Sequence, residues 1–365
     1  MTTPGPISYP SANAVREKIH DRQRVRSLWP GLASFVFPLL AWSGLVVAVI
    51  LAPWWAKIPL GFLNGIAIGV MFIVGHDACH GALFPRRWMN RFAGRVSLLP
   101  SLHPYTAWTH NHNGLHHGFT NIKEKDPGFP PLSLAEYQRL PAWNRFLHRQ
   151  YRTWYGLGLL YFCEMWIKWE MLPSRERAPR KTLKYNLDRL LVVLFMACWI
   201  GALAWGAAIT NGSILFNIVA GFALPQLVWN WLIGFIILQQ HTHPRVPWYS
   251  EADSPEPTFF QAQVKATPHL VFPAPFRFLM RHVMEHTAHH TDTSIPLYKL
   301  TEAQAELEKT YRREMVRVMW SPGMFMKTLR TCRLYDYAKH RWQDYNGTYL
   351  TAPLVESEEG ERSAG

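Results

Sequence analysis

Three stretches of at least 18 residues contain no Asp, Glu, Lys, Arg or His, and their lengths limit the possible folds more than any other feature. They are residues 29–56, 58–75 and 190–240. A helix needs about 20 apolar residues to cross a hydrocarbon layer about 30 Å thick, so the first two stretches predict one membrane span each. The third has 51 residues and is interrupted only by the turn sequence TNGS at residues 210–213. It therefore predicts two spans joined by a short turn.

The predicted spans cover about residues 29–52, 56–75, 189–209 and 214–238. They form two helical hairpins, so both termini and the segment between the hairpins share one face of the membrane. Six Lys and Arg residues lie at positions 175–189, just before the third span, whereas the two outer turns contain only Lys57. Because cytoplasmic loops are enriched in Lys and Arg, the shared face is predicted to be cytoplasmic.

The composition also separates this chain from an ordinary soluble domain, since 48% of its residues are hydrophobic and only 17% are charged. We expect an all-α, polytopic membrane protein with four transmembrane helices and a cytoplasmic helical cap formed by about residues 76–188 and 239–320. Residues 1–28 are predicted to form a basic cytoplasmic segment and residues 29–320 the membrane domain. Residues 321–365 are predicted to be a C-terminal extension that ends in a disordered tail.

Within the cap, Arg residues alternate with apolar residues at positions 86–108, a pattern typical of a helix lying at the membrane surface. Residues 132–185 predict further amphipathic helices, with an additional span as the alternative. Thr301 and Gln304 have the spacing of a capping box, which predicts a helix from there through about Trp320. The four cysteines form no C-x-x-C pair, so neither a disulfide framework nor a thiolate metal site is indicated.

Histidines are gathered in three short clusters, with the sequences HDACH, HNGLHH and RHVMEHTAHH. Their members are His76, His80, His112, His116, His117, His282, His286, His289 and His290. Residues three or four apart share a helix face, so on α-helices each cluster would present a stripe of imidazoles. Imidazole is a good ligand for zinc, copper, iron and nickel. Three clusters on one predicted face indicate a shared metal site rather than separate structural histidines.

The order of spans and clusters resembles that of the integral-membrane fatty acid desaturases and related hydroxylases. The strings HDACHG, HNGLHHGFTN, LQQHTHPRVPWY and EHTAHHTDTSIPLY are similar to the omega-6 (delta-12) and omega-3 acyl desaturase branch, including its bacterial members. The resemblance covers about residues 30–320. In one respect the chain differs, because three residues separate His112 from His116 where many desaturases have two. This spacing leaves open whether His110 takes the place of His112.

The resemblance implies a non-haem di-iron centre held by imidazoles. The implied ligands are His76, His80, His112, His116, His117, His241, His286, His289 and His290. Among these, His241 matches the position of a ninth ligand between the fourth span and the third cluster, and His243 is the alternative. Residues that would orient the ligand rings, as hydrogen-bonded neighbours of metal ligands do, are Asp77, Asp126, His243, His282, Glu285 and Asp292.

The resemblance also implies oxygen-dependent desaturation of a fatty acyl chain, with delta-12 or omega-6-like regiochemistry. The expected partners are an acyl lipid, acyl-CoA or acyl-carrier substrate, the lipid bilayer, and an external electron donor such as ferredoxin or cytochrome b5, with no nucleic acid. A membrane di-iron hydroxylase, ketolase or acetylenase acting on a lipid, alkane or carotenoid is the alternative, because such enzymes differ in pocket shape rather than in ligands. A non-catalytic metal transporter would need ligands within the spans, and the third and fourth predicted spans contain none.

Overall fold

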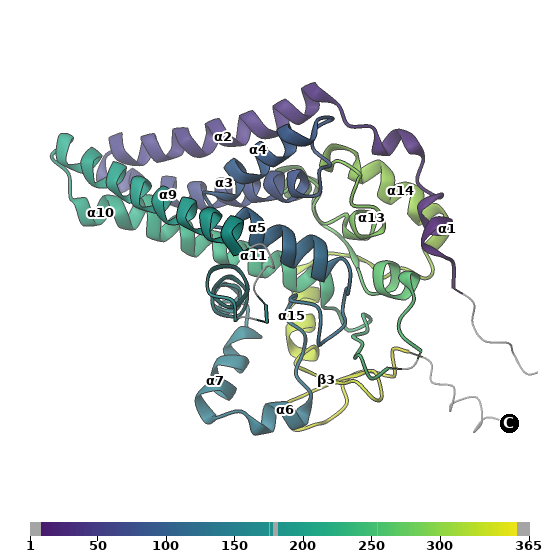
Figure 1. Cartoon of the computed structure of the whole chain (residues 1–365). Helices are drawn as coiled ribbons and strands as arrows, with labels where there is room; N and C mark the ends of the chain where they lie inside the picture. The colour runs from purple at the N-terminus through teal and green to yellow at the C-terminus, as the bar shows by residue number, and fades with distance from the viewer. Residues whose placement is uncertain (1–8, 175, 178–181, 254, 356–365) are drawn as a thin grey trace, which may run out of the picture.

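The computed structural model describes residues 9–174, 176–177, 182–253 and 255–355. Among these residues, four helices are long and apolar enough to cross a membrane. They are α2 (Leu28–Leu51), α3 (Trp54–Cys79), α9 (Thr182–Ile209) and the run Ile214–His241, which comprises α10 (Ile214–Ile218), the π-helical turn η4 (Val219–Ala223) and α11 (Leu224–His241). These helices extend together away from the rest of the chain (Figure 1). The prediction of a predominantly helical membrane protein with four spans is confirmed.

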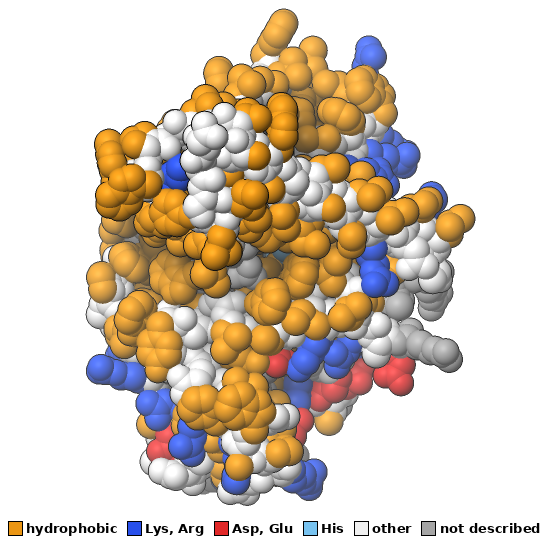
Figure 2. Space-filling view, turned by 90° about the vertical axis from the view of Figure 1, so that its left-hand side faces the viewer, with side chains coloured by type: hydrophobic (Ala, Val, Ile, Leu, Met, Phe, Trp, Pro, Cys, Tyr) orange, Lys and Arg blue, Asp and Glu red, His pale blue; other side chains and the backbone are white. Residues whose placement is uncertain are grey.

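The outer surface of the bundle is apolar. In the most apolar 18-residue segments of α2 and α9, only 22% and 28% of the residues are buried within the protein. The exposed side chains include Phe37, Leu40, Leu194 and Trp205. Hydrophobic side chains cover most of the face at the free end of the bundle, and Lys and Arg lie mainly toward its edges and lower part (Figure 2). A surface of this extent needs lipid around it.

The central helix of the bundle is α3, which is 61% buried in its most hydropathic window. It contacts the run Ile214–His241 through glycines at every fourth position. A Cβ atom at Gly61 would lie 2.1 Å from the Ala220 carbonyl oxygen, and one at Gly65 would lie 2.5 Å from Val228 Cβ. Small residues with this spacing let two membrane helices approach until their backbones touch.

Lys57 does not lie at the surface of an outer turn, as its place between two apolar stretches suggested. It belongs to the first turn of α3 and is 7% exposed. Its ammonium group donates hydrogen bonds to the carbonyls of Val49 and Ile50 and to Asn217 Oδ1, at 2.8, 3.0 and 2.6 Å. The two carbonyls belong to the last turn of α2, where carbonyl groups have no N–H partner within the helix. Lys57 thus ties three spans together at the end of the bundle.

Between the two hairpins, the chain forms the first half of the cap. Its helices are α4 (Arg87–Leu98), α5 (Tyr105–Trp108), the π-helix η2 (Thr109–His116), α6 (Leu134–Arg139), α7 (Ala142–Tyr151), α8 (Leu157–Leu160) and the π-helix η3 (Tyr161–Met171). The predicted surface helix corresponds to α4, whose Trp88 and Phe92 are exposed. A capping box of Ser133 and Glu136 starts α6. Helices α8 and η3 adjoin, and neither is among the four helices that are long and apolar enough to cross a membrane.

After α11, the chain forms the second half of the cap. Its elements are η5 (Gln261–Lys265), β1 (His269–Val271), α12 (Ala274–Leu279), α13 (His286–Thr291), η6 (Leu297–Lys299), α14 (Leu300–Tyr311) and β2 (Arg317–Met319). Strands β1 and β2 pair in parallel, with His269 opposite Arg317. The short N-terminal helices α1 (Ala12–Arg16) and η1 (Asp21–Arg24) attach to this half through an Arg24–Asp292 ion pair of 2.7 Å.

The predicted helix from Thr301 through about Trp320 is too long, and its capping box is wrong. The helix α14 ends at Tyr311, and β2 follows within the predicted range. Gln304 Oε1 accepts a hydrogen bond from the Ala288 N–H at 2.9 Å, so this side chain caps α13 rather than its own helix. Thr301 Oγ1 bonds to His282 Nδ1 at 2.9 Å. Tertiary contacts therefore use both side chains that the local pattern assigned to a cap.

Residues 321–355 pack against the cap. They form α15 (Pro322–Thr331) and an antiparallel hairpin of β3 (Leu334–Asp336) and β4 (Arg341–Gln343). Phe325 of α15 belongs to the same hydrophobic cluster as Phe235 of α11. The Tyr335 N–H donates to the Leu132 carbonyl at 3.0 Å, which joins the hairpin to the segment before α6. Residues 356–365 of the predicted tail lie outside the described residues.

Candidate metal centre

The first histidine cluster lies where α3 enters the cap. His76 occupies the last turn of α3, and His80 is its C-cap residue, with its N–H bonded to the His76 carbonyl at 3.3 Å. The two imidazole centroids are 4.9 Å apart. A membrane-spanning helix therefore delivers both rings to one point at the cap end of the bundle.

The second cluster lies on the π-helix η2, whose wider turns change which residues share a face. The His117 N–H bonds to the His112 carbonyl at 3.1 Å, a bond between residues five apart. The Nε2 atoms of these two residues lie 3.1 Å apart. His116 belongs to a different group of rings. The predicted α-helical pitch is therefore wrong, because residues five apart meet here, although the rings of His112 and His116 also stack with centroids 5.2 Å apart.

The third cluster lies on α13, where His286, His289 and His290 are all buried. His282 is not part of this helix. Arg281 and His282 have φ angles of 49° and 61°, so the chain passes through two left-handed residues before α13 begins. The prediction that His282 extends the imidazole stripe is wrong for this reason.

The structure assembles nine histidines into two groups whose potential ligand atoms lie within 4.8 Å of one another. The five-histidine group consists of His76, His80, His112, His117 and His289. The four-histidine group consists of His116, His241, His286 and His290. The groups adjoin, since the rings of His117 and His290 stack with centroids 4.2 Å apart. All nine histidines implied as ligands are thus brought together, whereas His243 and His110 belong to neither group.

The ring nitrogens have spacings that fit a bound cation. The Nε2 atoms of His286 and His241 are 2.8 Å apart, and those of His289 and His117 are 3.2 Å apart. Metal–imidazole distances of about 2.0–2.1 Å place two nitrogens on one ion about 3 Å apart. In addition, Nε2 of His80 and Nε2 of His290 are buried without a hydrogen-bond partner. The donor set therefore fits a metal in each group.

Burial keeps these imidazoles neutral and so leaves their lone pairs available. It lowers the pKa of the buried rings outside the spans well below its ordinary value, and neighbouring imidazoles lower it further, at His80, His112, His117, His286, His289 and His290. A metal ligand must be unprotonated, so the site needs no proton release from these rings before a cation binds.

Side-chain acceptors orient three rings of the four-histidine group. Asp126 Oδ1 lies 2.8 Å from His116 Nδ1, Asn121 Oδ1 lies 3.2 Å from His241 Nδ1, and Gln263 Oε1 lies 2.8 Å from His290 Nδ1. Because each bond uses the Nδ1 atom, the Nε2 atom of the same ring points away from the acceptor. Asp126 has the orienting position predicted for it. Sequence reasoning missed the other two, although Asn121 ends the string HNGLHHGFTN; no signal marked Gln263.

The remaining residues predicted to orient ligands have other neighbours. His243 Nδ1 accepts a hydrogen bond from the Arg245 N–H at 3.1 Å. Asp292 bonds to Arg24 and to Ser294. Glu285 Oε1 lies 3.4 Å from His282 Nδ1, while Oε2 of Glu285 and Oδ2 of Asp77 are buried without a partner.

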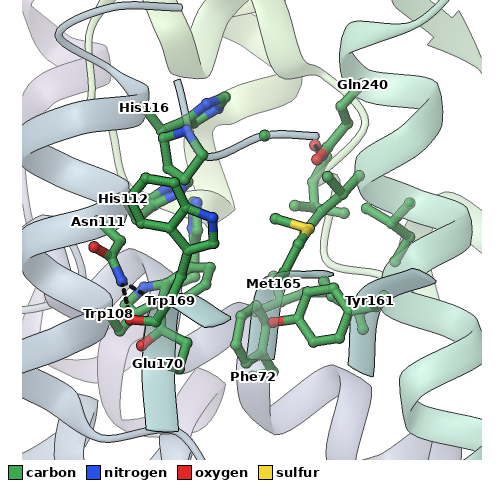
Figure 3. Close-up of a pocket in the computed structure, with 18 of the residues that line it drawn as sticks. Phe72, Trp108, Asn111, His112, His116, Tyr161, Met165, Trp169, Glu170 and Gln240 are labelled. Atoms are coloured by element: carbon green, nitrogen blue, oxygen red, sulfur yellow. Dashed lines mark hydrogen bonds between the residues drawn. The ribbon is translucent and has the colours of Figure 1, made fainter. Parts of the chain in front are cut away.

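An apolar cavity extends from the histidines between α3, α11 and η3. At one end its wall includes His76, His112, His116 and His241, and at the other Gly69, Phe72, Tyr161 and Trp229. Figure 3 shows His116 and Gln240 at one end, Phe72 and Tyr161 at the other, and Met165 between them. Trp229 and His241 are twelve positions apart on α11, a length of about 18 Å at the helical rise.

Residues of η3 that sequence reasoning placed on a surface helix line this cavity. Glu170 is 4% exposed, and its Oε1 accepts a hydrogen bond from Asn111 Nδ2 at 2.9 Å, beside Trp108 (Figure 3). Burial raises the pKa of Glu170 to about 8, so this carboxyl is mostly protonated at physiological pH. At the far end, the Tyr161 hydroxyl lies 2.7 Å from His103 Nε2. The cavity is therefore almost free of charge along its length.

The four candidate spans identify an integral membrane protein. Its neutral imidazoles meet beside an apolar cavity and form a histidine-rich site that can bind metal. The family model for fatty acid desaturases matches residues 52–322, so this chain belongs to the fatty acid desaturase family. It is an oxidoreductase that acts on lipid within the bilayer.

Characterised relatives are similar over most of the chain. The sn-1 oleoyl-lipid 12-desaturase of Picosynechococcus sp. is 26% identical over 350 residues, covering 91% of this chain and 95% of the relative. The same-named desaturase of Synechocystis sp. is 27% identical over 304 residues, covering 80% of this chain and 79% of the relative. The chloroplastic omega-6 fatty acid desaturase of Glycine max is 25% identical over 294 residues, covering 79% and 65%.

Proposed function

We propose that this protein uses two iron ions and dioxygen to introduce a double bond into a fatty acyl chain, with delta-12 or omega-6-like regiochemistry. The observation that carries the proposal is the pair of adjoining histidine groups at one end of an apolar cavity. The names of the oleoyl-lipid 12-desaturases and omega-6 desaturases similar to it support the position of the double bond.

The nine grouped histidines would hold the two ions. Iron supplies the activation of dioxygen that hydrogen removal from an unactivated methylene group requires. The chain's own residues bind and position the substrate. Phe72, Ile233 and Ile237 offer apolar walls for the acyl chain, and the length of the cavity determines which carbons lie beside the histidines. The buried rings and apolar walls also exclude bulk water from the site.

The proposal includes an orientation and a source of electrons. The histidine site and both termini face the cytoplasm, where a soluble donor such as ferredoxin or cytochrome b5 reaches the site from the aqueous side. A net charge of +13 suits the docking of an acidic donor protein. The acyl chain enters from the bilayer as part of a lipid or on an acyl carrier.

Product analysis tests this function directly. The protein is expressed, together with a ferredoxin and its reductase, in a host whose fatty acids lack a delta-12 double bond, and the fatty acids are identified by mass spectrometry. We expect a diunsaturated product from oleoyl chains that is absent from the His289→Ala variant. A hydroxylated product would instead identify the protein as a hydroxylase, the principal alternative.

Metal analysis tests the centre independently of activity. The purified protein is expected to contain about two irons per chain, because the nine rings divide into two groups. One tightly bound zinc per chain without iron-dependent turnover would contradict a di-iron centre.

A further inference from the structure

A second cluster of buried polar groups lies in the cap, between α7 and the β3–β4 hairpin. Arg152 follows α7, His148 lies within it, and each is 5% exposed. The Arg152 nitrogens Nε, Nη1 and Nη2, both ring nitrogens of His148 and the Tyr345 hydroxyl are buried and have no hydrogen-bond partner. The rings of His148 and Tyr345 have centroids 6.1 Å apart, so these polar atoms lie in one region, and buried polar atoms in a folded protein ordinarily have a partner.

The charge of Arg152 is not compensated by a carboxylate within the described part of the chain. Arg152 Cζ lies 4.9 Å from the centroid of the Phe129 ring, and Arg149 and Arg333 lie 5.2 and 5.4 Å from that of Tyr345. Among the described residues, Arg152 forms no ion pair. The ionisable groups that influence it are Tyr345, Cys332 and Tyr337, which are neutral at physiological pH.

Arginine cannot relieve this situation by losing its proton, because its guanidinium stays charged under all physiological conditions. A buried charge without a partner is strongly unfavourable, so the folded protein requires an acceptor here. Burial, and the neighbouring Arg152, lower the pKa of His148 to about 3. The neutral imidazole therefore contributes one N–H donor, and the Tyr345 hydroxyl contributes another. A planar guanidinium with two additional donors matches the oxygens of a phosphate group.

The surroundings of the cluster place it at the membrane interface. On the outer face of α7, Trp143 and Phe146 are 64% and 49% exposed, and their rings stack with centroids 5.4 Å apart. Trp154 and Tyr155 follow Arg152 and are 54% and 57% exposed. At the height of α6 and α7 in Figure 1, the lower part of Figure 2 shows hydrophobic side chains flanked by Lys and Arg. Exposed Trp and Tyr are typical of the level of lipid headgroups.

We propose that Arg152, His148 and Tyr345 form a binding site for the phosphate group of a membrane phospholipid. The phosphate oxygens accept hydrogen bonds from the Arg152 guanidinium, the His148 ring and the Tyr345 hydroxyl, and they neutralise the buried charge. Phe129, which stacks on Arg152, directly follows Pro127 and Gly128 in the cavity wall. Bound lipid therefore stabilises the loop that closes this part of the cavity. The site does not depend on the proposed reaction.

Thermal unfolding of the purified full-length protein in a phosphate-free maltoside detergent tests the site. The additions are dioctanoyl phosphatidylglycerol, dioctanoylglycerol and sodium phosphate, each at the same ionic strength. We expect phosphatidylglycerol to raise the unfolding temperature by at least about 2 °C, as ligand binding to the native state does, and dioctanoylglycerol to leave it unchanged. Arg152→Met should abolish this response and Tyr345→Phe should reduce it, whereas the exposed Arg145→Met on α7 should retain it.

Three results would overturn the assignment. A response to inorganic phosphate alone would show that the occupant is a free anion rather than a lipid. An equal response of the parent and Arg152→Met would place lipid binding elsewhere. If no addition changed the unfolding temperature and Arg152→Met were more stable than the parent in every condition, the guanidinium would be shown to be unpaired in solution. If Arg152→Met does not fold, Arg152→Lys keeps the charge but loses the planar set of donors, and Tyr345→Phe removes one donor, so each is expected to reduce the response to phosphatidylglycerol.

Discussion

At the scale of single residues, His241 and His243 differ in their neighbours although they are two positions apart. His241 Nε2 faces His286 Nε2 at 2.8 Å, whereas His243 is hydrogen-bonded to its own loop. We therefore expect His241→Ala to lose activity and part of the bound iron, because a coordination position is opened. His243→Ala should retain both. Iron content by atomic absorption, together with product yield, checks the two variants.

A histidine outside the two groups serves as the control for this pair. His20 is exposed and caps the short helix η1, so His20→Ala should resemble the parent. His103 is unsuitable, since it is 1% exposed and is bonded to Tyr161 in the cavity wall. If His243→Ala lost iron while His241→Ala kept it, the ninth ligand would be His243.

Asp126 holds the ring of His116 and also accepts the N–H groups of Asn121 and Gly128, both at 2.7 Å. In Asp126→Asn, one carboxylate oxygen is replaced by an amide that cannot accept a hydrogen bond, so a ring or a backbone contact is lost. We expect metal affinity or activity to fall by about 10- to 100-fold. Asp292→Asn is the matched control, because Asp292 bonds to Arg24 and Ser294 instead of a ring. If Asp292→Asn lost iron and Asp126→Asn did not, Asp292 rather than Asp126 would be the residue that supports the metal ligands.

At the scale of helices, the contact between α3 and the run α10–α11 depends on glycines that allow close backbone approach. A methyl group at Gly61 would meet the Ala220 carbonyl oxygen at 2.1 Å, and a backbone atom cannot rotate away as a side chain can. We expect Gly61→Ala to destabilise the protein by about 1–3 kcal/mol, the usual cost of overpacking. Thermal unfolding in detergent, followed by tryptophan fluorescence, measures the effect.

Gly44 in α2 provides the comparison, because no atom lies within 4 Å of a Cβ built there. Gly44→Ala should leave stability unchanged or raise it by up to about 1 kcal/mol through helix propensity. Equal unfolding temperatures for Gly61→Ala and Gly44→Ala would show that the two helices can separate without loss of packing.

At the scale of the whole molecule, the cap lies at one end of the two hairpins of spans, together with the first and last described residues (Figure 1). Exposed Ser174 and Glu251 lie before the third span and after the fourth, and Ser213 lies in the turn between them. With Cys163 and Cys198 replaced by Ser, an impermeant maleimide should label Ser213→Cys in intact cells. Ser174→Cys and Glu251→Cys should be labelled only after permeabilisation. If one of these two variants were labelled in intact cells and the other only after permeabilisation, the four-span topology would be contradicted.

The number of spans and the positions of the histidine clusters followed from the sequence alone, because they depend on properties of contiguous residues. An uncharged stretch is either long enough to cross a hydrocarbon layer or it is not. The membership of the two histidine groups was decided only by tertiary structure. The π-helical pitch of η2 brought His117 together with His112, and two left-handed residues removed His282 from α13.

Tertiary structure also supplied the partners that orient the rings. Gln263 reaches His290 from η5, and Asn121 reaches His241 across 120 residues of chain. Gln304 caps a helix other than its own. Such contacts depend on how separate elements pack together, and a periodic pattern within one segment carries no record of them. The sequence therefore determined which residues could form the site, and packing in three dimensions decided which of their atoms meet.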